Sequence, residues 1–238
     1  MFLISEEILE ENPEYICQSF VRDIYARTSD NQHDCKDGWS VTEIYDPSTD
    51  TSKISTPLIT PRWKHTATLL NDGKVLVVGG TNNSSSILEA EIFDPSTETW
   101  TDVGPMFHPR SGHTASLLSD GRVLISGGFT YVPISYAEIY DAKEGWIKTE
   151  NLMGPRYMHS AVPLGDGEVL VIGGRAGLFT NLRRTELYDS DAGSWSVKGN
   201  MPIALWDHSV IPVDCNKVFL VGGKKSDGSP SEAEDLFE

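Results

Sequence analysis

Residues 62–80 read RWKHTATLLNDGKVLVVGG, and this order of residue types decides the fold. The run from His65 to Leu70 is followed by Asp72-Gly73 and then by the continuous apolar run Val75 to Val78. Strand-forming runs separated by Asp-Gly indicate a β-hairpin, whose two-residue turn needs positive φ at both central positions. The Gly-Gly pair at Gly79 then ends the second strand, where we expect a close approach of backbones.

The same pattern recurs along the 238-residue chain at spacings of 46 to 49 residues. Histidines, Gly-Gly pairs, glutamates and tryptophans recur at nearly the same spacing, so differences in length between units fall in loops. The chain length divided by this spacing predicts about five units. The recurring residues are His65, His113, His159 and His208; the pairs starting at Gly79, Gly127, Gly173 and Gly222; Glu43, Glu91, Glu138, Glu186 and Glu234; and Trp100, Trp146 and Trp195.

The second strand of each unit is apolar at successive positions, so both of its faces must be buried. A third strand such as Ala90 to Asp94 and a more polar fourth strand at the tryptophan complete a four-stranded antiparallel sheet. A small twisted sheet that is apolar on both faces buries them against copies of itself, arranged as a radial ring. The sequence therefore predicts an all-β fold, a β-propeller of about five blades.

These residues resemble the kelch repeat proteins, whose unit has a Gly-Gly pair after its second strand and then a tyrosine and a tryptophan at fixed distances. The stretch Arg62-x-x-His65-Thr66-Ala67, the pair Gly79-Gly80, residues 90–95 (AEIFDP) and Trp100 are similar to the variant seen in the galactose oxidase propeller. The match covers Glu43 to Phe237, with three complete units and a partial unit at each end. The resemblance implies a kelch-type propeller, but it does not determine function, because kelch rings include enzymes and binding scaffolds.

We predict a kelch-repeat propeller over residues 43–238, preceded by an N-terminal segment over residues 1–42. In this scheme Phe2 to Ser5 supply the strand that the last unit lacks, and residues 20–27 form a degenerate second strand of the first blade. Two alternatives stay open, a helix over residues 5–27 or an incomplete ring of four to five blades in a chain that is a fragment of a longer protein.

The composition excludes several kinds of partner. With 19 basic and 35 acidic residues the formal net charge is −16, which opposes binding to nucleic acid or to an anionic membrane surface. The three cysteines, Cys17, Cys35 and Cys215, are too few for a disulfide framework or a zinc site. Their odd number leaves at least one thiol outside any disulfide, which indicates a reducing compartment. The acid-rich start lacks the features of an export signal. We expect a cytoplasmic protein without a cofactor.

The in-phase residues are expected to be structural, so no catalytic residue or metal ligand is assigned. Histidines at one strand position, each followed by threonine or serine, indicate a repeated hydrogen bond, since strands of different blades rarely bring four ligands to one ion. The glutamates indicate hydrogen bonding between blades. The tryptophans, with Phe93, Tyr140 and Tyr188, indicate apolar contacts between blades.

The segments that vary between units indicate the recognition surface. Loops that leave the second strands and loops that enter the first strands must emerge at one end of a propeller, and we call this surface the loop face. The loops that leave comprise residues 81–88, 129–135, 175–184 and 224–231, and the loops that enter comprise residues 60–64, 109–112, 155–158 and 205–207.

Basic and aromatic residues are concentrated on the loop face, whose acids are few, among them Asp207 and Asp227. Nine of the 19 basic residues lie there, which favours a carboxylate-bearing partner. For the arginine of each R-x-x-H motif, a purely structural role between blades is an open alternative. The predicted ligand-binding residues are Arg62, Trp63, Arg110, Phe129, Tyr131, Arg156, Tyr157, Arg175, Arg183, Arg184, Trp206, Lys224 and Lys225, with Lys64 and Phe179 beside them.

The leading interpretation is a non-catalytic scaffold that binds an acidic protein or peptide, as the kelch resemblance also implies. One alternative is a carbohydrate-active enzyme resembling the galactose oxidase or sialic acid epimerase propellers. The oxidase resemblance would require a cysteine near a tyrosine, and only Cys17 has one close by in sequence, Tyr15. A third hypothesis is the substrate-recognition part of a ubiquitin ligase adaptor, although residues 1–42 match neither a BTB domain nor an F-box.

Overall fold

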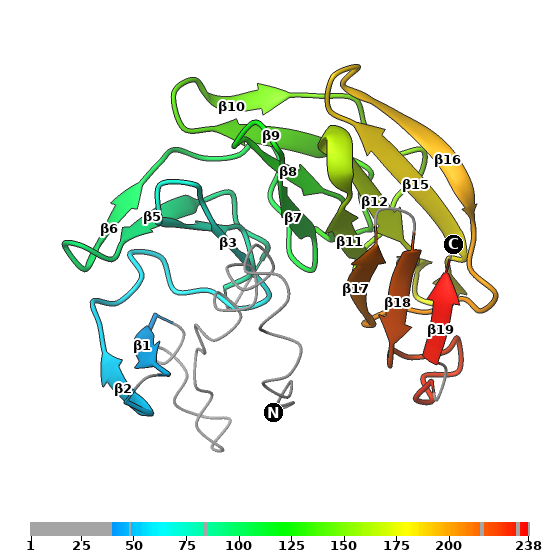
Figure 1. Cartoon of the computed structure of the whole chain (residues 1–238), viewed down its shortest axis with the longest axis horizontal. Helices are drawn as coiled ribbons and strands as arrows, with labels where there is room; N and C mark the ends of the chain where they lie inside the picture. The colour runs from blue at the N-terminus through cyan, green and yellow to red at the C-terminus, as the bar shows by residue number, and fades with distance from the viewer. Residues whose placement is uncertain (1–39, 48, 83–84, 215–216, 232–233, 238) are drawn as a thin grey trace.

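In the computed structural model the described residues are 40–237, without residues 48, 83–84, 215–216 and 232–233. They form antiparallel sheets that stand side by side along an arc, fanning out from a common centre (Figure 1). The described residues contain one 3-10 helix, Gly165–Gly167, and no α-helix, which confirms the predicted all-β class. None of them forms a helix long and apolar enough to cross a membrane. Cytoplasmic localisation stays a prediction.

Three sheets are complete blades, each with its four strands in chain order from the centre outwards. Their innermost strands lie next to one another around the centre of the arc. The first complete blade consists of β3 (Thr66–Leu69), β4 (Val75–Val78), β5 (Ala90–Asp94) and β6 (Thr99–Asp102); the second of β7 (Thr114–Leu117), β8 (Val123–Ser126), β9 (Ala137–Asp141) and β10 (Gly145–Lys148); and the third of β11 (Ser160–Pro163), β12 (Glu168–Ile172), β15 (Arg184–Asp189) and β16 (Ser194–Asn200).

A partial sheet stands at each end of the arc, as predicted. The first contains β1 (Glu43–Asp46) and β2 (Thr51–Ile54), and the last contains β17 (Ser209–Asp214), β18 (Lys217–Val221) and β19 (Glu234–Phe237). A small hairpin of β13 (Arg175–Gly177) and β14 (Thr180–Asn181) projects from the loop between β12 and β15.

The N-terminal predictions fall outside the described residues. These are the strands at Phe2 to Ser5 and at residues 20–27, and the alternative helix over residues 5–27. All three cysteines lie outside them as well. The closure of the ring and the division into residues 1–42 and 43–238 therefore stay predictions.

The continuous apolar strands β4, β8 and β12 are buried on both faces, which is the property that predicted the blades, whereas β18 in the last sheet is buried only at alternate positions. Leu76 and Val78 of β4 pack with Val123 of the following blade, whereas Val77 packs towards Leu58 and the preceding sheet. Leu76, Val77 and Val78 have no solvent-exposed surface. Each interior blade thus depends on both of its neighbours for burial.

The repeated tryptophans join neighbouring blades, as predicted. Each ring packs on the aromatic residue opposite it, for example Trp146 on Tyr140 with ring centroids 5.2 Å apart. Its Nε1–H also donates to a backbone oxygen of the preceding unit, at 3.0 Å from Trp146 to Gly104 and at 2.9 Å from Trp195 to Glu150. The polar edge of each buried ring is therefore satisfied between blades.

The Asp-Gly turns differ from the predicted two-residue turn. Gly73 has a φ of 83°, but Asp72 does not have a positive φ. The Gly73 N–H donates to the Leu70 oxygen at 3.0 Å, and the Leu70 N–H donates to the Lys74 oxygen at 2.8 Å. Asn71 enlarges the loop to three residues, and such loops need only one left-handed residue, which the glycine provides.

The Gly-Gly pairs allow the expected close approach between one blade and the loop that enters the next. The Gly128 N–H donates to the Arg156 oxygen at 2.8 Å, and a Cβ atom placed on Gly127 would lie 2.6 Å from that same oxygen. The equivalent Gly222 in the last sheet has nothing within 4 Å of its Cβ position among the described residues. The two positions share a left-handed backbone, with φ of 62° and 66°.

These two glycines provide a matched test of blade contact. In both G127A and G222A, a left-handed alanine costs about 1–2 kcal/mol. Only in G127A does the methyl group overlap the loop that enters the next blade, and we expect this overlap to destabilise the fold by a further amount of about 1–3 kcal/mol. Urea unfolding of both variants measures the difference. Equal destabilisation would show that the described contact between blades does not form.

Candidate functional site

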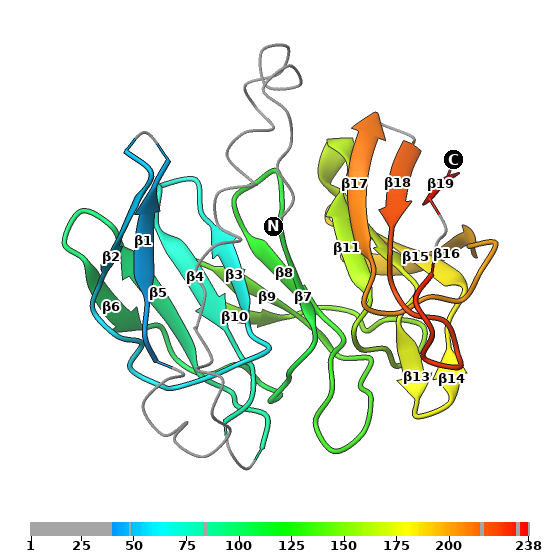
Figure 2. The same ribbon diagram turned by 90° about the horizontal axis from the view of Figure 1, so that it is seen from below.

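The two sets of loops emerge at the same end of the blades, as predicted, and they are joined in pairs. Figure 2 shows this end at the bottom, with hairpin β13–β14 among the loops. In the pair of Trp63 and Thr81, backbone hydrogen bonds of 3.0 and 2.8 Å run in both directions. Four antiparallel bridges connect an entering loop with a leaving loop, and they join Trp63 with Thr81, Ser111 with Phe129, Tyr157 with Arg175, and Trp206 with Lys224.

A chain of backbone hydrogen bonds links successive loops around the centre. The N–H of Gly112 donates to the Lys64 oxygen at 3.2 Å, that of Met158 to Gly112 at 2.8 Å, and that of Asp207 to Met158 at 2.9 Å. All four residues are left-handed, with φ between 50° and 58°. Non-glycine residues in this conformation cost about 1–3 kcal/mol each and persist only where the surroundings hold them, so these loops form a rigid frame.

Five of the predicted ligand-binding residues meet on this frame, and we call them the cation–aromatic cluster. They are Phe129, Tyr157, Arg175, Trp206 and Lys224. The Arg175 guanidinium lies 4.7 Å from the centre of the Trp206 ring and 6.0 Å from that of Tyr157. The Lys224 Nζ also lies 4.7 Å from the Trp206 ring, and the rings of Phe129 and Tyr157 are 5.1 Å apart. Aromatic faces attract such cations and fix their positions.

The charges in the cluster are only partly compensated. Lys224 forms an ion pair with Asp207 at 3.3 Å, and both side chains are about half exposed. Arg175 makes no ion pair with a described residue, and its Nε is buried without a hydrogen-bond partner among them. Because the Arg175 side chain is only partly buried, a carboxylate that reached its guanidinium would form a charge-assisted pair that the described residues do not supply.

The three arginines of the R-x-x-H motifs are not at the surface, which corrects their prediction as ligand-binding residues. Arg110 is fully buried, and its Nη1 donates to the oxygens of Gly127 at 2.8 Å and Tyr136 at 2.7 Å. Its Nη2 pairs with the buried Glu138. Arg62 and Arg156 make the same contacts with Glu91 and Glu186.

The glutamates of these pairs also hold the entering loops. Glu138 accepts the backbone N–H groups of Phe107 at 2.6 Å and His108 at 3.1 Å. This confirms a structural role for Glu91, Glu138 and Glu186, although their hydrogen bonds hold the entering loop of their own blade rather than joining two blades as predicted. The pairing also accounts for the burial of the arginines, whose charge is neutralised inside the blade. The sequence carried a signal for the pairing, because arginine precedes glutamate by 29, 28 and 30 residues in the three units.

The other predicted residues lie around the cluster. Trp63 carries Lys64 above its ring at 4.5 Å, and Tyr131 is 84% exposed at a loop tip. Arg183 donates through Nε to the Met201 oxygen at 2.6 Å, and Arg184 pairs with Glu186 at 2.7 Å, so both are engaged within the third complete blade. Lys225 follows Lys224 and is partly buried, and Phe179 is exposed on the β13–β14 hairpin.

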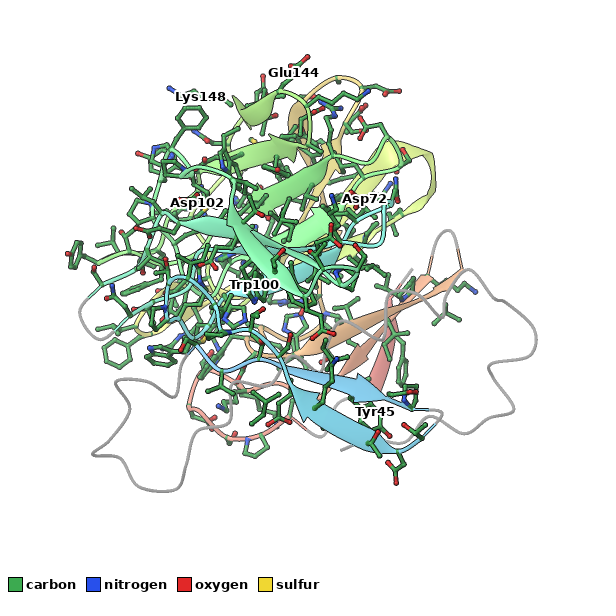
Figure 3. The ribbon with its side chains drawn as sticks, turned by 90° about the vertical axis from the view of Figure 1, so that its left-hand side faces the viewer. Tyr45, Asp72, Trp100, Asp102, Glu144 and Lys148 are labelled. Atoms are coloured by element: carbon green, nitrogen blue, oxygen red, sulfur yellow. The ribbon has the colours of Figure 1, made fainter. Side chains whose placement is uncertain are left out.

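The two ends of the blades differ in charge. In Figure 3 the blades are seen from the side, with Asp72 at the hairpin-turn end and Asp102 at the loop end of the first complete blade. The hairpin turns contain thirteen acidic and four basic residues, whereas the loop face retains six unburied basic residues against two acids. The turns counted are residues 46–50, 71–74, 94–98, 119–122, 141–145, 165–168, 189–193 and 214–217.

Two of the in-phase histidines make the predicted repeated hydrogen bond between blades. The Nε2 of His113 lies 2.9 Å from the Thr66 hydroxyl, and the Nε2 of His159 lies 2.9 Å from that of Thr114. Burial, followed by the nearby arginine charge, holds the pKa of both imidazoles well below the usual range. Burial lowers the pKa of His65 and of His208 to about 4. Among the described residues, no group of three histidines, cysteines or acids could hold a metal ion.

The buried histidines make stability sensitive to acid. Because each folded-state pKa lies below the unfolded value of about 6.5, the unfolded chain binds more protons, and stability falls as the pH drops from about 6.5 towards 4. Each histidine then removes up to about 1.4 kcal/mol per pH unit, a slope reached once the pH is well below about 6.5. Urea unfolding at pH 7, 6 and 5 measures this slope, and H113Q, which keeps a polar partner for Thr66, reduces it. An unchanged slope in H113Q would contradict the assignment.

The arginine–glutamate pairs lead to a stability test. Arg110→Met leaves Glu138 buried without its cation and costs about 3–5 kcal/mol, and adding Glu138→Leu recovers only part of this loss, because the backbone groups that both side chains bind stay unpartnered. The control is Lys74→Met, which removes a partly exposed pair with Asp94 at 3.6 Å and costs below about 1 kcal/mol. Chemical unfolding of the three variants checks the order. A single mutant as stable as the control would refute the framework role.

Comparison with protein families identifies one repeat directly. Residues 62–107 match the family model of the kelch motif, which confirms the resemblance predicted from sequence. This stretch runs from the buried Arg62 through the first complete blade to the loop that enters the second. No curated protein sequence matches the chain.

Proposed function

We propose that this chain, a propeller of kelch repeats, is a non-catalytic scaffold that binds an acidic protein or peptide segment through its loop face. Kelch repeats commonly mediate protein interactions. The observation that carries the proposal is the Arg175 side chain, which is only partly buried, is stacked on aromatic rings and has no ion pair with a described residue. The enzyme and ligase-adaptor alternatives have no specific observation in their favour among the described residues.

The chemistry of the cation–aromatic cluster suits a carboxylate. A guanidinium presents planar pairs of N–H groups that match the two oxygens of a carboxylate, and stacking leaves this edge available while it restricts the side chain. Lys224 lies on the same Trp206 ring and adds a second positive charge. Because the frame beneath is rigid, little conformational entropy is lost when a partner binds.

The uneven charge distribution favours one orientation of approach. An acidic segment is repelled by the hairpin-turn end and attracted by the loop face, so the net charge of −16 does not oppose binding at the cluster. The aromatic rings of Trp63, Tyr157 and Trp206 add contact area of the kind that contributes most at protein interfaces.

A binding measurement tests this proposal with a defined probe, the fluorescein-labelled peptide Ser-Glu-Glu-Ala-Glu-Glu-Ser. The double variant Arg175→Ser/Lys224→Ser should weaken its binding by about tenfold or more, or about 1.4 kcal/mol, because it removes both cations of the cluster. Added salt should weaken binding to the wild-type chain. Fluorescence anisotropy measures each affinity.

The matched control is Lys74→Ser/Lys143→Ser, which removes two positive charges at the hairpin-turn end. This variant has the same net charge as the loop-face double mutant, and we expect its affinity to stay within about twofold of wild type. If both double mutants lose affinity equally, net charge alone governs binding and the loop face is not the site.

A further inference from the structure

Resting on the proposed function, we propose that a pocket beside the second complete blade is the anchor site of the loop face. It takes an aromatic side chain with a hydrogen-bond donor, such as tyrosine, from the acidic partner segment. The pocket has a volume of about 460 Å³. Its main walls are His108, Val132, Pro133, Tyr136 and Pro155.

The pocket is continuous with the cation–aromatic cluster. One loop joins them, because Phe129 belongs to the cluster and forms a β-bridge with Pro133 in the pocket wall. The same loop exposes apolar surface, with Val132 61% and Tyr136 40% exposed. A segment whose carboxylates contact Arg175 is therefore adjacent to an apolar recess, and an apolar side chain within that segment has a place to bind.

This recess is a departure from the repeat. In each complete blade, one variable position lies two residues before the buried arginine and another lies two residues before its glutamate. In the second blade these positions hold His108 and Tyr136, whose rings stack with centroids 3.8 Å apart. The third blade has Gly154 and Arg184 there, and a Cβ on Gly154 would lie 2.6 Å from the Arg184 Nη2, so the arginine covers that position. The first blade has a threonine and a glutamate. A framework that repeats while one position changes indicates a site of recognition at that position.

The polar groups of the pocket select the kind of side chain. His108 Nδ1 lies 3.1 Å from a Glu138 carboxylate oxygen, which can only accept, so Nδ1 carries the proton. In the neutral ring Nε2 is then an acceptor, and it serves a hydroxyl or indole donor bound in the pocket. Glu138 itself does not repel an acidic segment, because it is buried and paired with Arg110.

The experiment compares three labelled peptides, Ser-Glu-Glu-Tyr-Glu-Glu-Ser and the same sequence with phenylalanine or alanine at the centre. The wild-type chain should bind the tyrosine peptide at least about tenfold more tightly than the alanine peptide, with phenylalanine between them. Tyr136→Ala should abolish this preference. Tyr45→Ala, which changes an exposed ring of β1 outside the loop face and outside the pocket, should leave it intact.

His108→Phe separates the hydrogen bond from the packing. It keeps an aromatic ring against Tyr136, so tyrosine and phenylalanine should still bind better than alanine, but tyrosine should lose its advantage over phenylalanine. Thermal unfolding of each variant confirms that it is folded.

The outcomes distinguish this inference from the proposed function. If the wild-type chain binds all three peptides equally, the pocket inference is overturned while the loop face remains a binding site. If it binds none, the proposed function fails and the inference fails with it. A tyrosine preference that survives Tyr136→Ala places the anchor elsewhere and overturns the assignment to this pocket.

Discussion

The buried pairing of one arginine with one glutamate in every complete blade is the interaction on which the loop face depends. Burial is the largest influence on the pKa of Arg110 and lowers it, whereas the charge of Glu138 raises it. Removing both charges from water costs several kcal/mol per ion, and hydrogen bonds from the Arg110 Nη groups and to the Glu138 carboxylate offset this cost. Arg110 binds two backbone oxygens and Glu138 binds two backbone N–H groups. The pair therefore fixes the loop that enters the blade to the strand that carries the glutamate.

This use of charge explains why positive residues in the loops divide into two kinds. An arginine that recurs in phase with a glutamate is part of the framework and is unavailable to a partner. Arg175 and Lys224 have no such in-phase acid; they occupy positions where the other units have Thr81 and Phe129, and they stack on aromatic rings instead. The position of a basic residue in the repeat therefore distinguishes the framework arginines from the two cations that stack on aromatic rings at the surface.

Much of the fold follows from local sequence, whereas the site depends on contacts that local sequence does not show. The apolar runs, the Gly-Gly pairs and the tryptophans each act through periodicity or backbone conformation, so they could be predicted correctly. The burial of Arg62 could not be predicted from its own loop, because its partner lies 29 residues away. The His108–Tyr136 pocket depends on a stacking contact between two loops, and the Asp-Gly turn differed because one additional residue changed the loop length.

The separation of charge between the two ends acts differently at long and at short range. At physiological ionic strength charges are screened over about 8 Å, so the thirteen acids of the hairpin turns contribute little to the energy of a partner already bound at the loops. They contribute during approach, where repulsion from that end leaves the loop face as the favoured side. Affinity then depends on groups within contact distance, namely the stacked cations and the aromatic walls. A scaffold with a large net negative charge can therefore bind an acidic segment, provided that the stacked cations of its loop face lie together on a rigid frame.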